Sequence, residues 1–439
     1  MHIAVIGGGI IGCSTALHLL EAGVEQVTLV EAGNPGSATT GAGAGFVSHW
    51  SAGMFPLGEE GLALQQYGLE FYRGLHKLGT EIGYRPNGTL VMALSSQGWE
   101  DFVAPVLGSP YAPKAMQDLT AAEIGERMGG LVDPARVHSG AYNPHGIQVD
   151  TTLALRVLVG EIERLGGVVK SHTRVTSVRE ESGRVTVEAS AGTLAADGLV
   201  LAAGAWNNEL LTGLGWQLPM LRVVATRVVT DDRGLPSTLP TVQCGELRLW
   251  LRESFGAVMW GTGSHYAPIH RLGGGAVEPG QPRDSSLMQA MVDERMPTLE
   301  TVFPPLRGSR VASWAQGIPC YTPDVGLVVG QVPGTERIVV VGGDNETGVT
   351  HGPGLGRLAS EIVLDRPRFV DPTRFRVDRF DRMAFVSEAD VEAVLPAWNR
   401  RQGLRFSAAA DQGQAAAPSV ASGSTAGLPT RARTPSTSE

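Results

Sequence analysis

The sequence predicts an α/β fold in which two domains are interleaved. One domain is built on a parallel, helix-covered sheet, and the other is an α+β unit with a mainly antiparallel sheet. The first reason is that the chain has 439 residues, more than one domain usually contains. The second is a strand–helix–strand rhythm that opens the chain and returns twice, which is typical of parallel sheets. The third is that alternating residues and turn signals, typical of antiparallel strands, lie between these returns.

Composition and charge exclude several classes of protein. Hydrophobic residues make up 42% of the chain and glycine accounts for 58 residues, so we expect a large core with many tight turns. The 35 basic and 44 acidic side chains give a net charge of −9, so neither nucleic acid nor an anionic membrane is expected as a partner. No His-x-x-x-His or Cys-x-x-Cys pattern occurs, so no metal site is expected.

Cysteine usage and the N-terminal segment bear on localisation. Cys13, Cys244 and Cys320 are far apart and odd in number, which favours a reducing compartment over a disulfide framework. The first lysine or arginine is Arg73, so the apolar start of the chain lacks the basic region of a secretion signal. No segment reaches the length of a membrane span. The sequence therefore predicts a cytoplasmic protein.

The expected elements follow in order along the chain. Residues 3–6 and 27–30 are apolar runs typical of buried strands, and residues 10–22 between them have apolar side chains at helical spacing. Residues 39–45 have small side chains and predict a loop that a ligand can approach closely. Further helices are predicted at 60–78, 153–165 and about 353–364, and strands at 85–94, 168–178, 185–189, 197–203, 247–263 and 337–341.

The domain boundaries are predicted from the positions at which the strand–helix rhythm stops and resumes. The parallel-sheet domain should comprise residues 1–85, 145–220 and 320–380, and the antiparallel domain residues 86–144 and 221–319. Residues 381–406 predict a C-terminal extension with a surface helix at 387–398. Residues 407–439 are mainly Ala, Ser, Thr, Gly, Pro and Gln, and we expect them to be disordered because they bury too little apolar surface to offset the entropy of ordering.

The first strand–helix turn carries a dinucleotide-binding motif. Gly7-x-Gly9-x-x-Gly12 opens the helix, and Glu31 ends the next strand near the expected spacing of about 20 residues. Gly7 permits the turn, Gly9 lets backbone amides reach a diphosphate, and Gly12 lets the helix pack closely. Glu31 would accept hydrogen bonds from a ribose. The alternative is a glycine-rich turn without a ligand, which leaves three glycines unexplained. The motif predicts a Rossmann-like domain.

A second glycine-rich return favours FAD over a nicotinamide. A nicotinamide enzyme usually completes its sheet before adding another domain, whereas this sheet is interrupted and resumed twice. The last return runs through Val341-Gly342-Gly343-Asp344-Asn345-Glu346-Thr347-Gly348-Val349 into another glycine-rich helix N-terminus, a second position suited to an anion. Beside the N1 and C2 oxygen of an isoalloxazine, this terminus would favour the anionic reduced flavin.

Four segments occur in the same order as the motifs of a known family. They are residues 3–31, Leu201-Ala202-Ala203-Gly204-Ala205-Trp206, Tyr321-Thr322-Pro323-Asp324 and residues 343–356. They resemble the D-amino acid oxidase (DAO) family of FAD-dependent oxidoreductases, in particular its glycine oxidase, sarcosine oxidase and dimethylglycine dehydrogenase members. The resemblance implies FAD, and oxidation of a C–N bond by hydride transfer to flavin N5, giving an imine that hydrolyses. It also implies that FAD is bound by Gly7, Gly9, Ile10, Ile11, Gly12, Glu31, Ala32, Thr39, Thr40, Gly43, Ala44, Val175, Ala203, Gly204, Trp206, Gly343, Asn345, Gly348 and Val349.

The chain departs from relatives that attach FAD covalently. At the position of the sarcosine oxidase cysteine it has Gly317, and near that of the dehydrogenase histidine it has Ala42. Non-covalent FAD is therefore expected. Cys320 lies nearby and is interpreted as an inert buried thiol, the alternative being a redox or flavin-linking role.

The expected substrate end also departs from the family. Sarcosine-type oxidases place a lysine over the flavin, where this chain has Met259, so slow reaction with oxygen is predicted. The arginines that hold the substrate carboxylate in glycine oxidase-like members correspond to Pro319 and Glu346. An ionised Glu346 would repel a substrate carboxylate and attract a cationic amine, unless it simply faces water. Either Arg248, Arg252 and Arg310 substitute for the missing arginines, or they are solvated strand-end charges.

The candidate catalytic residues are Glu346, Met259, Tyr321, His265 and His49, with Trp260 and Tyr266 as further candidate pocket walls. For the aromatic residues and His265 the alternative is plain packing. Serine-hydrolase chemistry is excluded because no Gly-x-Ser-x-Gly turn occurs.

Three functions remain open. The first is an FAD-dependent enzyme, monomeric or homo-oligomeric, that acts on a small-molecule amine or N-substituted amino acid. The second is a flavin-bearing subunit whose substrate or electron acceptor is presented by a partner protein. The third, a nucleotide-binding module without catalysis, leaves the second domain unexplained.

Overall fold

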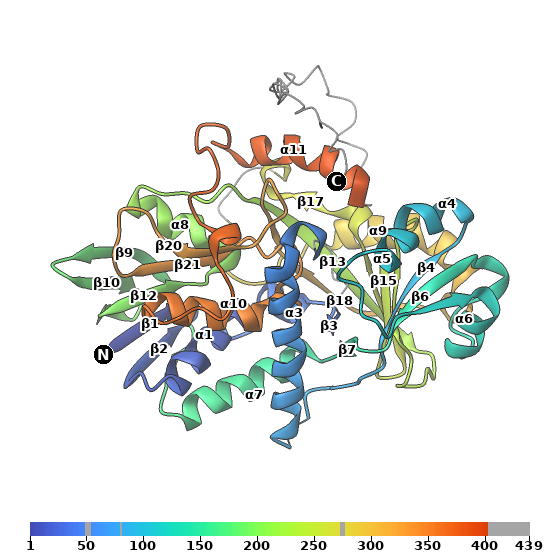
Figure 1. Cartoon of the computed structure of the whole chain (residues 1–439), viewed down its shortest axis with the longest axis horizontal. Helices are drawn as coiled ribbons and strands as arrows, with labels where there is room; N and C mark the ends of the chain where they lie inside the picture. Colours follow the sequence, from blue (N-terminus) through green and yellow to red (C-terminus); the bar gives the residue numbers. More distant parts are fainter. Residues whose placement is uncertain (49–53, 80, 273–276, 403–439) are drawn as a thin grey trace, which may run out of the picture. The chain divides into compact units, whose positions relative to one another are not determined.

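The computed structural model describes residues 1–48, 54–79, 81–272 and 277–402. The predictions made for His49 and for residues 407–439 lie outside these residues. Within them the strands form four sheets, and the two largest have six and ten strands (Figure 1). No helix in this part of the chain combines the length and apolar character needed to cross a bilayer.

The six-stranded sheet forms the Rossmann-like part of the molecule. Its order is β20-β21-β12-β1-β2-β8, and all neighbours are parallel except β20 and β21. Ile3 of β1 lies opposite Gly198 of β12 and Val27 of β2. The α/β fold class is therefore confirmed. The strands are β1 (His2–Ile6), β2 (Gln26–Val30), β8 (Val168–Lys170), β12 (Gly198–Leu201), β20 (Val328–Gln331) and β21 (Ile338–Gly342).

Both faces of this sheet are covered, because successive strand residues point in opposite directions. Ile3 and Val5 pack into an apolar core shared with α1 (Ile10–Glu21), α3 (Met54–Lys77), α7 (Thr151–Arg164) and α10 (Gly348–Val363). Ala4 and Ile6 pack into a second core. That core is shared with α8 (Asn207–Leu211) and with a three-stranded sheet of β9 (Val175–Glu181), β10 (Arg184–Ala189) and β11 (Gly192–Ala196).

Two glycines of the N-terminal motif are required by close backbone contacts. Gly7 has a φ of +108°, and a Cβ on it would lie 2.4 Å from the carbonyl oxygen of Ala202. A Cβ on Gly12 would lie 1.8 Å from the carbonyl oxygen of Gly7. The roles predicted for Gly7 in the turn and for Gly12 in helix packing agree with these contacts.

Helix α10 begins earlier than predicted. A start near Pro353 was expected because proline favours the first turn, but the helix begins at Gly348 and Pro353 lies inside it. Proline cannot donate the backbone hydrogen bond that the carbonyl of Val349 would otherwise accept. The hydroxyl of Tyr72 donates to that carbonyl at 3.0 Å instead. A side chain from α3 thus replaces the missing helical bond.

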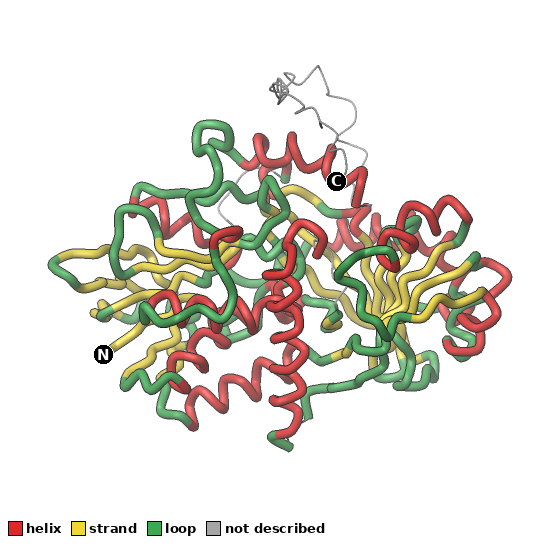
Figure 2. Tube along the Cα trace, in the orientation of Figure 1, coloured by secondary structure: helices red, strands yellow, loops and turns green. Residues whose placement is uncertain are grey.

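The ten-stranded sheet forms the second, mainly antiparallel part of the molecule (Figure 2). Its main path is β17-β13-β16-β15-β14-β4-β6-β5, with β18 and β19 also paired to β13, and only β4 and β14 are parallel. The strands are β4 (Thr89–Ala93), β5 (Gln117–Thr120), β6 (Ser139–Asn143), β13 (Leu221–Asp232), β14 (Thr241–Cys244), β15 (Leu249–Ser254), β16 (Ala257–Thr262), β17 (Ala267–Pro268), β18 (Val311–Gly317) and β19 (Cys320–Tyr321).

The chain passes between the two large sheets several times. A third core, which includes Trp260 and Phe303, packs the ten-stranded sheet against α6 (Ala121–Arg127) and α9 (Ser285–Val302). A small sheet of β3 (Phe46–Val47) and β7 (Ile147–Gln148) lies where the chain leaves and re-enters the first part. The remaining short helices are α2 (Thr39–Ala42), α4 (Ser96–Gly98) and α5 (Ala104–Leu107).

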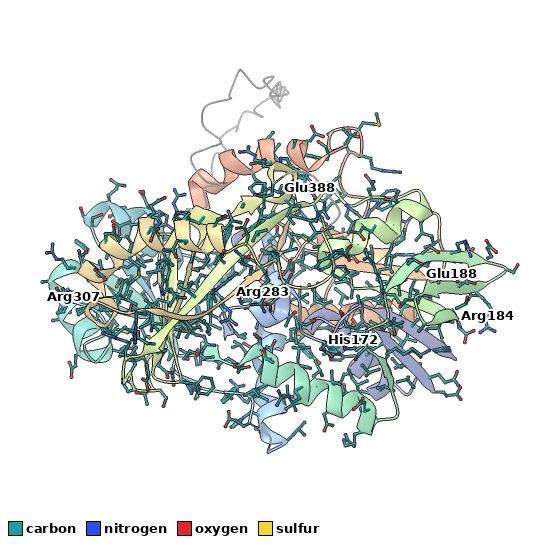
Figure 3. All side chains as sticks on the ribbon, turned by 180° about the vertical axis from the view of Figure 1, so that it is seen from behind. His172, Arg184, Glu188, Arg283, Arg307 and Glu388 are labelled. Carbon is teal, nitrogen blue, oxygen red and sulfur yellow. The ribbon has the colours of Figure 1, made fainter. Side chains whose placement is uncertain are left out.

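The C-terminal extension ends in α11 (Glu388–Gln402), near the predicted surface helix. Glu388, labelled in Figure 3, pairs with Arg222 of β13. Glu392 on the next turn accepts hydrogen bonds from Arg271 and lies 3.0 Å from Nε2 of His270. These ion pairs hold the start of α11 against the ten-stranded sheet.

Candidate active site

A cavity of about 380 Å³ connects the two large sheets. Its first end lies at the carboxyl ends of β1, β2 and β12, the edge at which open α/β sheets bind ligands. Its other end is lined by β13, β14 and β15 of the ten-stranded sheet. The volume is within the usual range for ligand pockets. One ligand, or two in contact, can therefore reach from the glycine motif to the second sheet.

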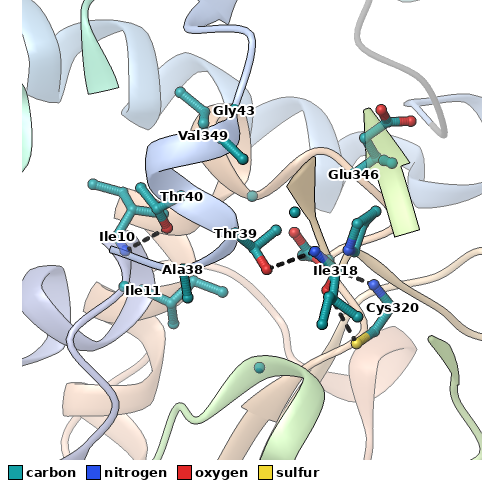
Figure 4. Close-up of a pocket in the computed structure, with 18 of the residues that line it drawn as sticks. Ile10, Ile11, Ala38, Thr39, Thr40, Gly43, Ile318, Cys320, Glu346 and Val349 are labelled. Carbon is teal, nitrogen blue, oxygen red and sulfur yellow. Dashed lines mark hydrogen bonds between the residues drawn. The ribbon is translucent and has the colours of Figure 1, made fainter. Parts of the chain in front are cut away.

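The glycine end is built mainly from backbone. Gly7, Gly9, Ile10 and Ile11 line it at the N-terminus of α1, where the N-cap residue Gly9 supplies no capping side chain. The backbone N–H of Ile10 donates to Oγ1 of Thr40 at 3.1 Å (Figure 4). The amides and the helix dipole at this terminus suit a diphosphate.

Glu31 is positioned by two backbone amides. Its Oε2 accepts from the N–H of Gly8 at 2.6 Å and its Oε1 accepts from the N–H of Gly33 at 2.7 Å. Each oxygen keeps a further lone pair, and the residue lines the cavity. This arrangement leaves the carboxylate able to accept from a pair of ribose hydroxyls.

Most of the predicted cofactor residues line this cavity. The exceptions are Gly12, which packs α1 against Gly7, and Asn345, whose side chain is buried and donates to the carbonyls of Gly326 and Gly343. A loop was predicted for residues 39–45. Residues 39–42 instead form the short helix α2, and only residues 43–45 are a loop. The residues that line the cavity are Gly7, Gly9, Ile10, Ile11, Glu31, Ala32, Thr39, Thr40, Gly43, Ala44, Val175, Ala203, Gly204, Trp206, Gly343, Gly348 and Val349.

One residue at the glycine end was missed by the sequence analysis. Arg174 lines the cavity and is held by Glu278 at 2.6 Å and Glu209 at 3.7 Å. No lysine or arginine precedes Arg73, so the first strand–helix–strand unit supplies no basic side chain to this end. Arg174 arrives from the turn before β9, and only the pairing of β2 with β8 brings it there.

The two positions at which relatives attach FAD are adjacent. A Cβ on Gly317 would lie 3.2 Å from the Cβ of Ala42, and both residues line the cavity without a nucleophilic atom. Cys320 also lines it, but burial raises the pKa of its thiol well above the ordinary value. A thiol that stays protonated is a poor nucleophile.

The comparison with known families agrees with this geometry. The sequence pattern of the FAD dependent oxidoreductase family, DAO, matches residues 2–362. The chain belongs to this family. Gly7 and Gly9 of the predicted dinucleotide-binding motif line the glycine end of this cavity.

Individual relatives of this oxidoreductase are distant. Dimethylglycine dehydrogenase of Homo sapiens is 25% identical over 84% of this chain, which spans only 44% of that protein. Glycine oxidase of Pseudomonas putida is 25% identical over 85% of this chain and 97% of its own length. The crystal structure of L-proline dehydrogenase from P. horikoshii has a TM-score of 0.75 at 19% identity, covering 87% of this chain and 98% of that one. The last likeness shows a shared fold.

The far end of the cavity is acidic. Glu346 lies in the loop before α10 and is among the residues that line the cavity (Figure 4). Tyr266 donates its hydroxyl to Oε1 of Glu346, and Tyr321 donates to Oε2 at 2.9 Å. Desolvation raises the pKa of the Glu346 carboxyl to about 7, although the hydrogen bonds from both tyrosines lower it.

Asp344 is a second carboxyl group at this end. It lines the cavity, and burial raises the pKa of its carboxyl to about 6 against hydrogen bonds from the backbone N–H groups of Cys320 and Gly348. Asn345 and Glu346 between it and α10 have φ values of 46° and 66°, a left-handed conformation that is unusual for residues other than glycine. Such strain persists only where the surroundings fix it, and it often marks functional loops.

One arginine was also missed, and the predicted candidate Arg252 is buried rather than a solvated strand-end charge. Arg227 on β13 lines the cavity and donates to the carbonyls of Gly41 at 3.0 Å and Ala42 at 2.8 Å. Arg252 on β15 donates to the carbonyl of Ala44 at 2.6 Å, and burial lowers its pKa to about 10. Together they hold residues 41–44 in place. The sequence shows an arginine within a predicted strand. Which face of the sheet its side chain lies on depends on how the strands pair.

The remaining candidates are spread around this end. Met259 is buried, and its sulfur lies 3.9 Å from Nη1 of Arg227. His265 lies 3.0 Å from Glu294 of α9 and is not among the residues lining the cavity, while Trp260 belongs to the third core. Arg248 lines the cavity, and Arg310 is exposed beside Asp231.

Proposed function

We propose that this oxidoreductase oxidises the C–N bond of a small amine or N-substituted amino acid and binds its FAD non-covalently. The observation that carries the proposal is the continuous cavity, which joins a cofactor-binding end to a polar end with titratable side chains. Bound FAD would supply the hydride acceptor, at flavin N5, and the resulting imine would hydrolyse.

The residues of the glycine end fit FAD. The turn at Gly7 leaves no room for a side chain, the N-cap residue Gly9 adds no capping side chain to the α1 terminus, and Glu31 offers free lone pairs. The glycine motif would hold the diphosphate, and Glu31 would hold the ribose. Non-covalent binding is supported by the absence of a nucleophilic atom on Gly317 and Ala42.

The residues of the acidic end supply positioning and a place for a proton. Hydride transfer from an amine requires its nitrogen lone pair, so an ammonium substrate must lose a proton first. Asp344 lines the same cavity, and its carboxyl, with a pKa of about 6, can accept that proton. Arg227 supplies positive charge at the cavity wall, where the sequence analysis expected none because Met259 replaces a lysine.

Anaerobic titration with amines tests this function. Purified protein should be yellow, and acid should release its flavin into the supernatant. Members of a panel of secondary amines and N-methyl amino acids should bleach the visible flavin band without air, and admitting air or an artificial acceptor should restore it. A yellow protein that dithionite bleaches but no amine does would contradict the proposal and favour the alternative of a flavin-bearing subunit with a partner protein.

A further inference from the structure

We propose that the acidic end of the cavity is a cation-binding subsite, formed by Glu346 with Tyr266 and Tyr321. The preferred substrate is then a diamine or related amine whose second charged group is positive. This inference rests on the proposed amine oxidation and names its substrate class. It reverses the charge expected for an enzyme that holds an amino acid by its carboxylate.

The first argument is the orientation of Glu346. Both of its carboxylate oxygens accept a hydrogen bond from a different tyrosine hydroxyl. Tyr321 is buried and Tyr266 nearly so, and they come from β19 and from the segment before β17. Glu346 is exposed, so a ligand can reach it, yet two buried donors from separate segments hold its carboxylate in one orientation.

The second argument is the lack of a protein cation for this carboxylate. Among the residues that the structure describes, no arginine, lysine or histidine forms an ion pair with Glu346. Arg227, which lines the same cavity, donates to the carbonyls of residues 41 and 42, and Arg222 of β13 pairs with Glu388. A cationic ligand would supply the missing partner.

The third argument is the second carboxyl group. Asp344 lines the same cavity and raises the pKa of Glu346 by repulsion. A cation would be attracted by both carboxylates, while a substrate carboxylate would be repelled by both. Specificity of this kind depends as much on the repelled competitor as on the bound ligand.

A matched pair of substrates tests the subsite. N-Methylputrescine and 4-methylaminobutanoate share a methylamino end and a four-carbon skeleton, and they differ in carrying an ammonium or a carboxylate at the other end. Rapid anaerobic mixing with the holoenzyme measures a Kd and a limiting rate of flavin reduction for each. We expect the diamine to bind at least about tenfold more tightly. Equal Kd values, or tighter binding of the amino acid, would overturn the proposal.

Glu346→Gln is the decisive variant, because glutamine keeps the size of the side chain and its acceptor oxygen. The preference for the diamine should fall to within about twofold, with flavin content unchanged. Glu336→Gln is the matched control, since it removes the same charge from an exposed turn between β20 and β21. An unchanged preference in Glu346→Gln would overturn the proposal.

The subsite can fail separately from the proposed function. If neither compound reduces the flavin, amine oxidation of this class is contradicted, but perturbation of the flavin spectrum on binding still yields both Kd values. If both reduce it with equal Kd values, amine oxidation stands and the cation subsite is wrong.

Discussion

The two ends of the cavity are built in different ways. The glycine end uses backbone amides from short contiguous segments, around Gly7 to Ile11 and Glu31 to Gly33. The acidic end uses side chains from separate elements, Tyr266, Tyr321 and Glu346, that meet only in the folded chain. The glycine end tolerates few substitutions, because any residue type other than glycine adds side-chain atoms where the ligand would lie. At the acidic end, one substitution can reverse the charge of the ligand that is preferred.

The largest expected effect is loss of the cofactor on filling the glycine end. A Cβ on Gly9 would face Oγ1 of Thr40 at 3.2 Å, beside the diphosphate position. Gly9→Val should give folded but colourless protein. Gly160→Val is the control, because Gly160 lies on α7 with nothing within 4 Å of its Cβ position. Absorbance and far-UV circular dichroism of the purified variants check this. A yellow Gly9→Val protein with full flavin content would contradict the account.

The acidic end should reverse its preference on reversal of charge. Glu346→Arg places a guanidinium where the carboxylate was, and it can bind a substrate carboxylate in bidentate fashion. We expect 4-methylaminobutanoate to become the tighter ligand, by about tenfold or more, while flavin content stays near that of the wild type. Anaerobic half-reactions measure both compounds. Retention of the wild-type order would show that Glu346 does not contact the substrate.

Binding of a cation at this end should depend on pH. Tyr266, Tyr321 and Asp344 face Glu346, and desolvation raises its pKa to about 7. The ionised form binds the cation, so affinity for the diamine should be full above about pH 8 and decline roughly tenfold by about pH 6. Kd values against pH measure this, with Glu346→Gln as the reference in which only Asp344, with a pKa of about 6, still titrates. Tyr321→Phe removes a donor to the ionised form and should move the midpoint upward. A flat wild-type profile would refute the assignment.

The smallest expected effect concerns the electron acceptor. The sequence predicts slow reoxidation by oxygen because Met259 replaces a lysine, yet Arg227 already places a cation 3.9 Å from the Met259 sulfur. A buried lysine beside that cation would have a lowered pKa. Met259→Lys should therefore raise the oxygen rate by no more than about tenfold. Stopped-flow reoxidation measures it. Wild-type peroxide production that matches amine turnover would contradict slow reoxidation.

The sequence predicted the glycine end of the cavity better than the acidic end. The fold, the glycine turn and Glu31 were predictable, because a local motif fixes their geometry. Arg174 and Arg227 were not, because each reaches the cavity only through pairing of strands distant in sequence. Arg252 was a candidate, but its burial required the fold. The start of α10 was misplaced at Pro353 because Tyr72, remote in sequence, replaces the bond that proline lacks. Glu346 was identified from its loop, but its two tyrosine partners required the fold.

The central claim is that an amine bound at the acidic end reduces a flavin held at the glycine end. The most direct measurement is the rate of anaerobic flavin bleaching against N-methylputrescine concentration, in the wild type and in Glu346→Gln. The account predicts saturation in both, with a Kd at least about tenfold higher in the variant and a similar limiting rate. Identical curves for the two proteins, or no bleaching of a fully loaded wild type, would contradict it.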